Sequence, residues 1–197
     1  MHYYYQKYPF LHYDYTDYDG NYVMFSVPPE LLATAFFQHF GVSPKTFFDC
    51  GAATGEIVYM AEKMGMRATG IDIKKYPYQS ENLNKLFQQG KIQIKSILDC
   101  GQIRADLVYC NGVLTYFQER DLLRVLGKFN KCKMLIAIHN TSEDVTAAAK
   151  QGNVLVTCNK PRLIRPKDWW INKFLECGFD SEYDNKTQCF YACPRTR

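Results

Sequence analysis

The sequence has 197 residues, 47% of them hydrophobic, and a formal net charge of +4. This length suits one α/β domain with a substantial core and is short for two. The sequence contains no apolar run long enough to span a membrane, which takes about 18 residues or more. The tyrosine-rich start also lacks the apolar centre of a signal peptide. We therefore expect one cytoplasmic domain over residues 1–197, with no membrane partner and a charge too mild for a dedicated nucleic-acid binder.

Eight cysteines are scattered over the sequence, and no two of them form a C-x-x-C pair. Several lie inside segments that we predict to be strands or helices. Buried free thiols are therefore favoured over zinc ligands or disulfides. We predict no metal site.

The first 22 residues hold eight of the 15 tyrosines and show no helical or strand period. One interpretation is an irregular arm, packed on the domain with the ring bodies buried and the hydroxyls wet. The other is a lid that closes over a substrate and excludes water from the reaction. Pro28 and Pro29 then open a helix that ends at Gly41. Residues 1–45 thus form an arm and a helix, ahead of a core over 46–197.

A strand, a turn and the start of a helix are predicted in the segment from Phe47 to Gly55, FFDCGAATG. Two aromatic residues lead into the turn. Thr54 and Glu56 are suited to capping the helix and to the charge of its first turn. Gly51 and Gly55 lack Cβ atoms, so a ligand can lie against the main chain there and face the N-terminal amides of the helix.

The acidic residues around this turn indicate which ligand it binds. A dinucleotide fingerprint has glycine at the position of Glu56, and the carboxylates of Glu56 and Asp49 would repel a pyrophosphate. A cationic amino group suits them better. Asp72 follows at the end of a second predicted strand, 68–73, where a carboxylate can accept hydrogen bonds from both ribose hydroxyls. An adenosine with an amino-acid tail and no phosphate fits this pattern, so the expected cofactor is S-adenosylmethionine.

Over residues 45–197 the sequence resembles the class I S-adenosylmethionine-dependent methyltransferases. Residues 49–55 match the first motif of that family, with Ala53 where the middle glycine is usual. The extra methyl group of Ala53 lies where the methionine part of the cofactor is expected to approach the turn.

Three further segments carry the resemblance in the expected order. Asp72 and Ile73 resemble the ribose-binding acid and its adenine-packing neighbour. Residues 96–99 resemble the motif that contacts the adenine amino group, and residues 105–114 resemble the fourth strand and the loop after it. The resemblance implies these cofactor-binding residues: Asp49, Cys50, Gly51, Ala52, Ala53, Gly55, Asp72, Ile73, Leu98, Asp99, Asn111 and Gly112.

The rest of the chain alternates between helical and strand patterns. Residues 91–97 alternate apolar and polar side chains, which indicates a half-buried strand near a sheet edge. Residues 107–110 are nearly all apolar, as in a strand covered on both faces. The predicted elements are helix 79–89, strand 91–97, strand 107–110, helix 119–131 with Leu122, Leu123, Val125, Leu126 and Phe129 buried, strand 134–138, a short helix through 146–149, strand 154–157, helix 167–177 and a hairpin over 179–183 and 188–192.

This alternation of strands and helices predicts an α/β three-layer sandwich. The resemblance implies a Rossmann-like methyltransferase fold, with a mostly parallel seven-stranded sheet and one antiparallel strand, the last, inserted into it.

Methyl transfer from a sulfonium is an in-line displacement, so the enzyme mainly has to hold the acceptor close and exclude water. An acceptor that must lose a proton needs a base, and His139, at the end of strand 134–138, is the candidate. The alternative is that His139 only hydrogen-bonds a loop. Tyr116 and Asn111 follow strand 107–110, where they either contact the acceptor or the cofactor or serve as packing and turn residues.

Four basic residues lie close together in the loop 159–167. The loop is either simply solvated, or it binds the phosphate or carboxylate of an anionic acceptor. Together with Trp169 and Trp170 it could instead bind RNA by charge and stacking. Tryptophans in an amphipathic helix are more often part of the core.

The favoured function is a methyltransferase acting on an oxygen or nitrogen atom of a small molecule. The alternatives are an RNA or protein methyltransferase, and a domain that binds S-adenosylmethionine without catalysis. Methylation of an exocyclic base amine goes with an Asn- or Asp-Pro-Pro-aromatic tetrapeptide after the fourth strand. The sequence has Asn111-Gly-Val-Leu there, so a nucleic-acid partner is not favoured. The acceptor and the oligomeric state are not predicted.

Overall fold

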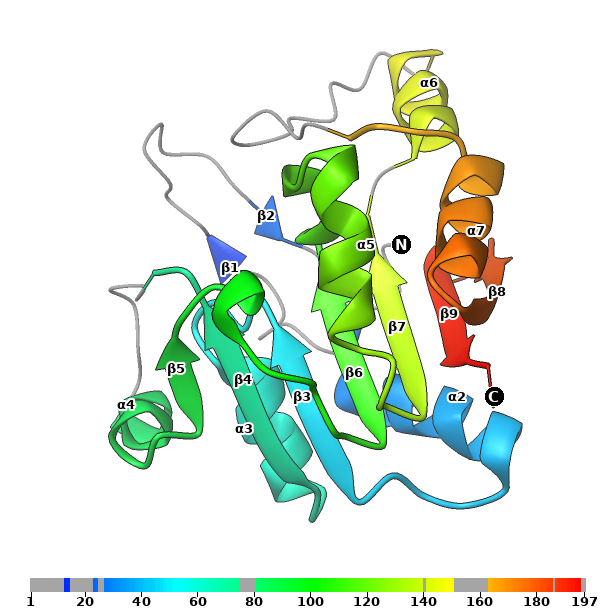
Figure 1. The fold of residues 1–197 in the computed structure, drawn as a ribbon. Coiled ribbons are helices and arrows are strands. Elements are labelled where there is room, and N and C mark those ends of the chain that lie inside the picture. Colours follow the sequence, from blue (N-terminus) through cyan, green and yellow to red (C-terminus); the bar gives the residue numbers. More distant parts are fainter. Residues whose placement is uncertain are drawn as a thin grey trace.

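A mostly parallel sheet forms the centre of the molecule (Figure 1). The computed structural model describes residues 13–14, 23–24, 27–74, 81–139, 141–150, 163–185 and 187–195. Within them, the main sheet has the strand order β5-β4-β3-β6-β7-β9-β8. The strands are β3 (Thr46–Cys50), β4 (Arg67–Asp72), β5 (Ile92–Ile94), β6 (Leu107–Asn111), β7 (Met134–Ile138), β8 (Phe179–Asp184) and β9 (Cys189–Pro194). β9 lies between β7 and β8 and runs antiparallel to both, which confirms the predicted seven-stranded sheet.

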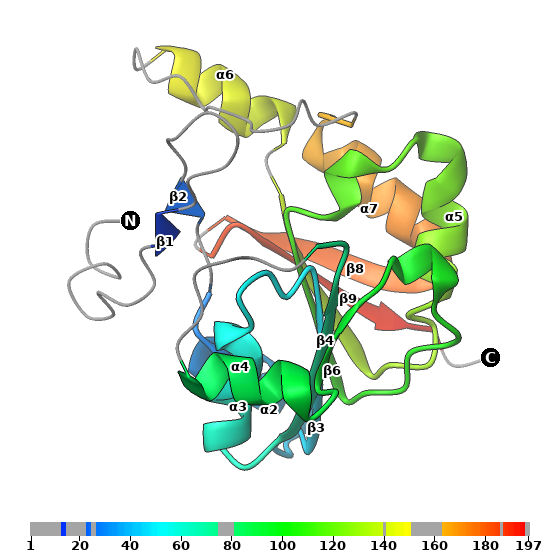
Figure 2. The same cartoon turned by 90° about the vertical axis from the view of Figure 1, so that its left-hand side faces the viewer.

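Helices cover the two faces of this sheet unequally. The helices are α2 (Pro29–Phe40), α3 (Glu56–Lys63), α4 (Glu81–Gln88), α5 (Glu119–Gly127), α6 (Ser142–Lys150) and α7 (Lys167–Glu176). α2, α3 and α4 pack on one face, and α5 and α7 pack on the other. α6 lies beyond the carboxyl ends of the central strands (Figures 1 and 2). The predicted three-layer sandwich is therefore confirmed.

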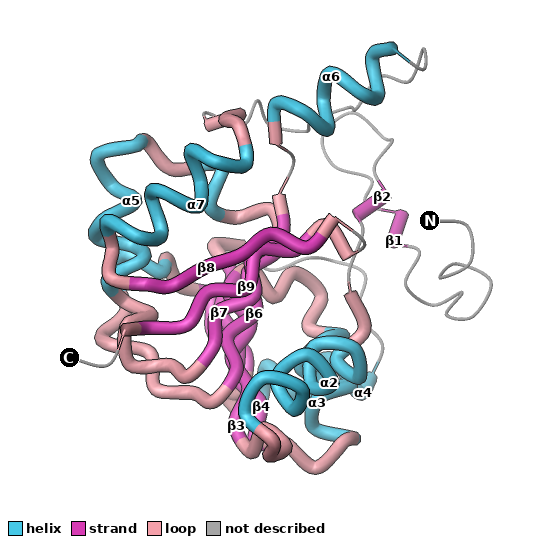
Figure 3. The backbone as a smooth tube through the Cα atoms, turned by 90° about the vertical axis from the view of Figure 1, so that its right-hand side faces the viewer, coloured by secondary structure: helices cyan, strands magenta, loops and turns pink. Residues whose placement is uncertain are grey.

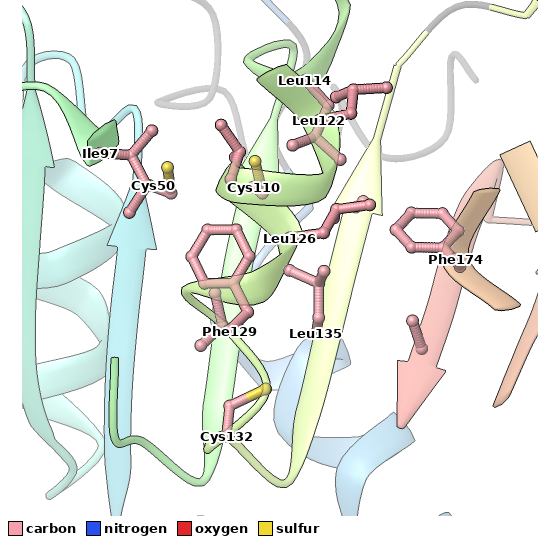
Figure 4. Close-up of a cluster of buried hydrophobic side chains, with 14 of the residues drawn as sticks. Cys50, Ile97, Cys110, Leu114, Leu122, Leu126, Phe129, Cys132, Leu135 and Phe174 are labelled. Carbon is pink, nitrogen blue, oxygen red and sulfur yellow. The ribbon is translucent and has the colours of Figure 1, made fainter. Parts of the chain in front are cut away.

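Two apolar clusters, one on each face, make up the core. Because alternate residues of a strand point to opposite faces, Phe47 and Tyr109 pack beneath α2 and α3, whereas Phe48 and Val108 pack beneath α5 and α7. Figure 4 shows the second cluster, in which Leu126 of α5 lies over β6 and β7. Strands that are covered on both faces in this way are mostly apolar, as β7 is throughout and β6 is up to Asn111.

α5 differs from the prediction in its end and in one side chain. It ends at Gly127, not at Lys131. Leu122 and Val125 are buried, but Leu123 is 53% exposed. Consecutive helix residues are about 100° apart around the axis, so Leu123 points away from the face that Leu122 buries.

The strand predicted over 91–97 is shorter in the structure. β5 ends at Ile94, and Ile97–Asp99 form a one-turn 3-10 helix, η2. The side chain of Ser96 accepts a hydrogen bond from the N–H of Leu98 at 3.2 Å. Such a local side-chain bond starts a helical turn in place of a strand. β5 does lie at one edge of the sheet, as predicted.

The described part of the N-terminal arm is a pair of two-residue strands. β1 (Tyr13–Asp14) and β2 (Val23–Met24) pair antiparallel. They lie near the carboxyl ends of the main strands, on the side of α2, α3 and α4 (Figures 2 and 3). The other residues of the predicted arm or lid, and the predicted strand 154–157, lie outside the described residues. Among the described residues, no helix is long and apolar enough to cross a membrane.

Candidate cofactor and acceptor site

The strands β3, β4 and β6 all end at one edge of the sheet, here called the carboxyl edge. In register, Cys50 lies between Ile71 of β4 and Cys110 of β6. The N–H groups of Gly51 and Ala52 both donate to the carbonyl oxygen of Ile71, at 2.9 and 2.8 Å. These two bonds fasten the turn after β3 to the end of β4. The parallel register therefore brings the predicted cofactor residues to the edge where α/β sheets bind ligands.

The turn after β3 has backbone angles that favour glycine. φ is +90° at Gly51 and Gly55, and +48° at Ala53. The N-cap of α3 is Gly55, and no side chain caps this helix. The predicted capping by Thr54 is therefore wrong, because the chain enters α3 through a left-handed glycine. Glu56 lies in the first turn of α3, as predicted.

The protein itself fills the space that the missing glycine side chains leave. A Cβ atom on Gly51 would lie 2.3 Å from Cγ2 of Val113, and one on Gly55 would lie 2.1 Å from Cδ1 of Ile92. The positive φ therefore favours glycine at both positions, and a larger residue would also displace Val113 or Ile92. The expectation that a ligand lies against the main chain of these glycines stays a prediction.

Two acidic groups beside the turn are unusually hard to ionise. Asp49, at the end region of β3, is buried. Burial, together with the nearby carboxylate of Asp72, raises the pKa of Asp49 to about 8. Burial also raises the pKa of Glu56 to about 7. A cation bound here would favour the ionised form of both carboxyl groups, whereas an anion would disfavour it. This part of the edge is therefore better suited to a cation.

Asp72 ends β4 and is held by main-chain donors. Its Oδ2 accepts from the N–H of Ala53 at 2.8 Å, and its Oδ1 accepts from the N–H of Lys74 at 3.1 Å. Burial raises the pKa of Asp72, against these hydrogen bonds, which lower it. The next residue, Ile73, is 77% exposed. Asp72 is therefore fixed in place, with an uncovered apolar side chain beside it.

The remaining predicted cofactor residues flank the turn on two sides. On one side lies η2, with Leu98 partly buried and Asp99 exposed. Its first residue, Ile97, lies beside Cys50 (Figure 4). On the other side, Asn111 is buried at the end of β6.

The chain after β6 bends sharply toward the candidate acceptor side. Gly112 follows Asn111 with φ at +69°, and its N–H donates to the carbonyl oxygen of Ile138 at 2.7 Å. This bond ties the loop after β6 to the end of β7. Tyr116 follows in the one-turn helix η3 (Leu114–Tyr116) and is 41% exposed.

His139 follows β7 and is enclosed by aromatic rings. Its ring centroid lies 4.0 Å from that of Trp170 and 4.8 Å from that of Phe190, and the His139 and Phe190 planes differ by 13°. Within the described parts of the chain, neither ring nitrogen has a hydrogen-bond partner. Burial lowers the pKa of His139 to about 3, so the imidazole is neutral. The predicted hydrogen bond to a loop is not found among the described residues, and no ring nitrogen is exposed as a base.

The sequence did not indicate the residues around His139. Trp170 comes from α7, Phe190 comes from β9, and Tyr183 of β8 contacts Phe190 with 4.6 Å between ring centroids. The indole N–H of Trp170 and the hydroxyl of Tyr183 are also buried without a partner among the described residues. Only the insertion of β9 beside β7 brings these distant aromatic residues to His139, so no local pattern could have revealed them.

The described end of the predicted basic loop contacts aromatic rings. The guanidinium carbon of Arg165 lies 5.7 Å from the ring centroid of Trp169, and Nζ of Lys167 lies 4.3 Å from that of Tyr183. Trp170 is fully buried. It is therefore not free to stack on a base, which weakens the RNA-binding interpretation.

The cysteines that the structure describes are all free thiols, and most are buried. Cys50 and Cys110 are register partners on β3 and β6. Their mutual hydrogen bond, together with burial, raises the pKa of the Cys50 thiol well above its usual range. No group of His, Cys, Asp and Glu side chains in the described segments could hold a metal ion.

Solved structures with a similar fold include methyltransferases. The sugar N-methyltransferase KedS8 from Streptoalloteichus sp. ATCC 53650 matches with a TM-score of 0.60 and 11% identity, over 85% of this chain and 86% of that one. The 1,6-didemethyltoxoflavin-N1-methyltransferase from Burkholderia thailandensis matches with a TM-score of 0.58 and 14% identity, over 84% of this chain and 77% of that one. That structure holds 1,6-didemethyltoxoflavin and S-adenosylhomocysteine.

A third similar structure, the pyocyanin biosynthetic protein PhzM, has a TM-score of 0.53 and 15% identity over 84% of this chain. This chain spans 55% of the length of PhzM. No protein-family model matches the sequence, and no curated protein matches it. At these identities the likeness concerns the fold, and the fold is the Rossmann-like fold of the class I S-adenosylmethionine-dependent methyltransferases.

Proposed function

We propose that this chain transfers the methyl group of S-adenosylmethionine to an oxygen or nitrogen atom of a small-molecule acceptor. The observation that carries this proposal is the pair of buried acids, Asp49 and Asp72, at the ends of neighbouring strands beside a left-handed turn. A ligand with an ammonium group and a ribose, and without a phosphate, suits this pair. S-adenosylmethionine is such a ligand, and when bound it supplies an electrophilic methyl group.

Asp49 is proposed to hold the amino group of the cofactor. With its pKa at about 8, this acid carries a proton at pH 7. A neighbouring ammonium group favours the carboxylate and so lowers the pKa. Cofactor binding near pH 7 should therefore release a proton from Asp49.

Asp72 is proposed to hold the ribose. A carboxylate has about four lone-pair positions. The N–H groups of Ala53 and Lys74 occupy one on each oxygen, and the N–H of Ile73 is a third main-chain donor to it. The remaining capacity of the carboxylate is proposed to accept from the ribose hydroxyls. The exposed side chain of Ile73 offers an apolar surface to the adenine ring. Leu98 and Asp99, in η2, are proposed to contact the edge of that ring.

The acceptor is proposed to lie at the ends of β6 and β7, beside the exposed ring of Tyr116. Exposed Arg165 is suited to an anionic group on that acceptor. We assign His139 to positioning, because its nitrogens are enclosed and its ring stays neutral. The chain would then act by holding the acceptor in line with the methyl group and excluding water. The names of the sugar N-methyltransferase KedS8 and of the 1,6-didemethyltoxoflavin-N1-methyltransferase state small-molecule acceptors, which supports an acceptor of this class.

Calorimetric titration with S-adenosylmethionine, S-adenosylhomocysteine and NAD tests the cofactor. We expect both sulfur compounds to bind and NAD not to, because the side chain of Glu56 stands where a dinucleotide fingerprint has glycine. NAD binding without any response to S-adenosylhomocysteine would contradict the proposal.

Transfer of a labelled methyl group to panels of small molecules, RNA and protein then tests the acceptor. We expect label only in the small-molecule panel. Labelled RNA, with gel shifts that weaken steeply between two salt concentrations, would support the RNA alternative instead. Cofactor binding with no transfer to any panel would favour a binding domain without catalysis.

A further inference from the structure

Among the residues that the structure describes, no helix lies over one part of the sheet. Residues 95–106 connect β5 to β6, all of them are described, and their only helical element is the single turn η2. In Figure 1, α5 and α7 lie in front of β6, β7 and β9, whereas only this connection crosses in front of β3 and β4. A parallel sheet is normally covered by helices on both faces. In the β3–β4 half this face is therefore covered by the connection in place of a helix, and an open area remains at the amino ends of the two strands.

Polar side chains occupy this open area at the amino ends of β3 and β4. Thr46 is the register partner of Arg67, and Phe48 is the partner of Thr69. By the alternation of the strands, these four side chains share the face on which Phe48 and Ile71 join the cluster beneath α5. Arg67 and Thr69 are exposed although β4 is an interior strand. The sequence thus places a polar surface where a core would be expected.

A fixed stretch of the connection forms the opposite side of a cavity of about 340 Å³. Gln102, Ile103 and Arg104 line it, facing the strands. The N–H of Ile103 donates to the carbonyl oxygen of Lys128 at 2.8 Å, and the carbonyl oxygen of Ala105 accepts from the N–H of Lys133 at 3.2 Å. These two bonds tie the connection to the end of α5 and to the chain after it, so this side of the cavity is held in place.

The lining carries two positive charges and no acidic side chain. Arg67 and Arg104 both line the cavity, and neither takes part in an ion pair among the described residues. The nearest acid in sequence, Asp106, is engaged elsewhere: its carboxylate accepts from the N–H groups of Lys45 and Thr46 at 2.8 and 3.1 Å, and contacts Nζ of Lys133 at 2.8 Å. Both guanidinium groups are therefore available to a ligand.

We propose that this cavity is a second binding site, which takes a small organic anion. Arg67 and Arg104 would hold its phosphate or carboxylate group, since guanidinium groups bind both in a bidentate manner. The hydroxyl of Thr69 and the amide of Gln102 supply further polar contacts, and Phe48 and Ile103 supply apolar ones. The volume is at the lower end of the range for small-molecule pockets. Thr46 lies about 13 Å along β3 from Cys50, so this site is separate from the carboxyl edge and does not depend on the proposed function.

Nuclear magnetic resonance titrations with phenyl phosphate, benzoate and neutral benzyl alcohol test the proposal. The protein is saturated with S-adenosylhomocysteine, so that the carboxyl edge is occupied. If it does not bind that compound, the titrations are made without it and still report on this site. We expect amide shifts at residues 67–69 and 102–105 with at least one of the two anions, and none with benzyl alcohol. Shifts with phenyl phosphate alone identify phosphate as the recognised group, and shifts with benzoate alone identify carboxylate.

The double variant Arg67→Gln, Arg104→Gln should weaken anion binding about tenfold or more, because each hydrogen bond to a charged group is lost. Arg120→Gln, a change of an exposed arginine at the start of α5, is the matched control and should leave it unchanged. Both arginines of the site are exposed, so the double variant should fold. No shifts with either anion, shifts confined to the carboxyl edge, or equal affinity in the double variant would each overturn the proposal.

Discussion

The two halves of the carboxyl edge are built in different ways. Around the ends of β3 and β4, main-chain N–H groups fix the turn and the carboxylate of Asp72, and buried acids set the charge. Around the end of β7 and the start of β9, the rings of Trp170 and Phe190 enclose a neutral His139 that has no described hydrogen-bond partner.

We therefore propose that the first half binds the cofactor and that the second half positions the acceptor. A half fixed by backbone bonds and charge can select a ligand by its ammonium and hydroxyl groups, and its behaviour should change with pH. A half fixed by ring packing can shape a cavity and exclude water, and its behaviour should depend on side-chain shape. Variants in each half should therefore fail in different ways.

The largest effect is expected for Asp49→Asn. In the folded protein Asp49 has a pKa of about 8, against 3.8 as its ordinary value. Between these values the native state keeps a proton that the unfolded state has released, so stability falls as pH rises through this window. The loss should be on the order of 4 kcal/mol by pH 7, and asparagine cannot ionise. Urea unfolding at several pH values should show a slope in the natural protein that is clearly smaller in the variant, where Glu56 and Asp72 still have raised pKa values.

The exposed Asp168 in α7 gives the matched control, Asp168→Asn. Its unfolding should follow the pH dependence of the natural protein. An equal slope in Asp49→Asn would show that Asp49 is ionised in the folded state, and the charge distinction between the two halves would be lost.

Asp72→Ala should weaken the binding of S-adenosylhomocysteine by about 2–4 kcal/mol, because a buried charge-assisted pair of hydrogen bonds is removed. The variant also removes the acceptor of the Ala53 N–H, so Asp72→Asn, which keeps an oxygen there, should be measured beside it. Calorimetry gives both affinities. An unchanged dissociation constant in a folded Asp72→Ala protein would place the ribose elsewhere.

In the aromatic half, His139→Phe should leave cofactor affinity unchanged and raise stability by about 1–2 kcal/mol, because it removes two buried nitrogens that have no partner among the described residues and keeps the ring contacts with Trp170 and Phe190. Turnover should fall if the neutral imidazole positions the acceptor. The pH profile of turnover should have the same shape in the natural protein and in the variant, with no limb near pH 6.5 in either. Denaturant unfolding and turnover at several pH values measure this. A clear loss of stability would show that the nitrogens are paired.

The smallest effect is expected for Ala53→Gly. A left-handed backbone costs an ordinary residue about 1–2 kcal/mol, and φ at Ala53 is +48°. Glycine relieves this cost but loses more chain entropy on folding, so the gain should stay below about 1 kcal/mol. Ala53→Val should have the opposite sign. Thermal unfolding of the two variants checks both signs. A glycine variant that is less stable than the natural protein would show that the left-handed backbone at Ala53 is not strained.

Much of the fold could be predicted because its signals are local. A glycine after the helix indicated where α2 ends, and apolar runs indicated β6 and β7. The predicted bounds of these elements differ from the observed ones by at most a few residues. The resemblance supplied the order of the sheet, including the inserted β9. The end of β5 was missed because Ser96 stabilises a helical turn that alternating polarity does not show, and Leu123 was misplaced because two adjacent leucines cannot both face the core.

The candidate site was predictable where the main chain builds it. Asp49, Asp72 and the turn between them stand at fixed spacings in the sequence, and the structure brings them to one edge. Two features could not be predicted in this way: Val113 and Ile92 lie against Gly51 and Gly55, and aromatic rings enclose His139. Both depend on contacts between distant segments, which no spacing in the sequence indicates.

The central claim is that the acid pair at the ends of β3 and β4 holds the amino group and ribose of S-adenosylmethionine. Calorimetric titration with S-adenosylhomocysteine at pH 7, in two buffers of different ionisation enthalpy, tests it most directly. We expect binding with release of a proton in the natural protein, and without that release in Asp49→Asn. Binding whose enthalpy is the same in both buffers, or no binding at all, would contradict it.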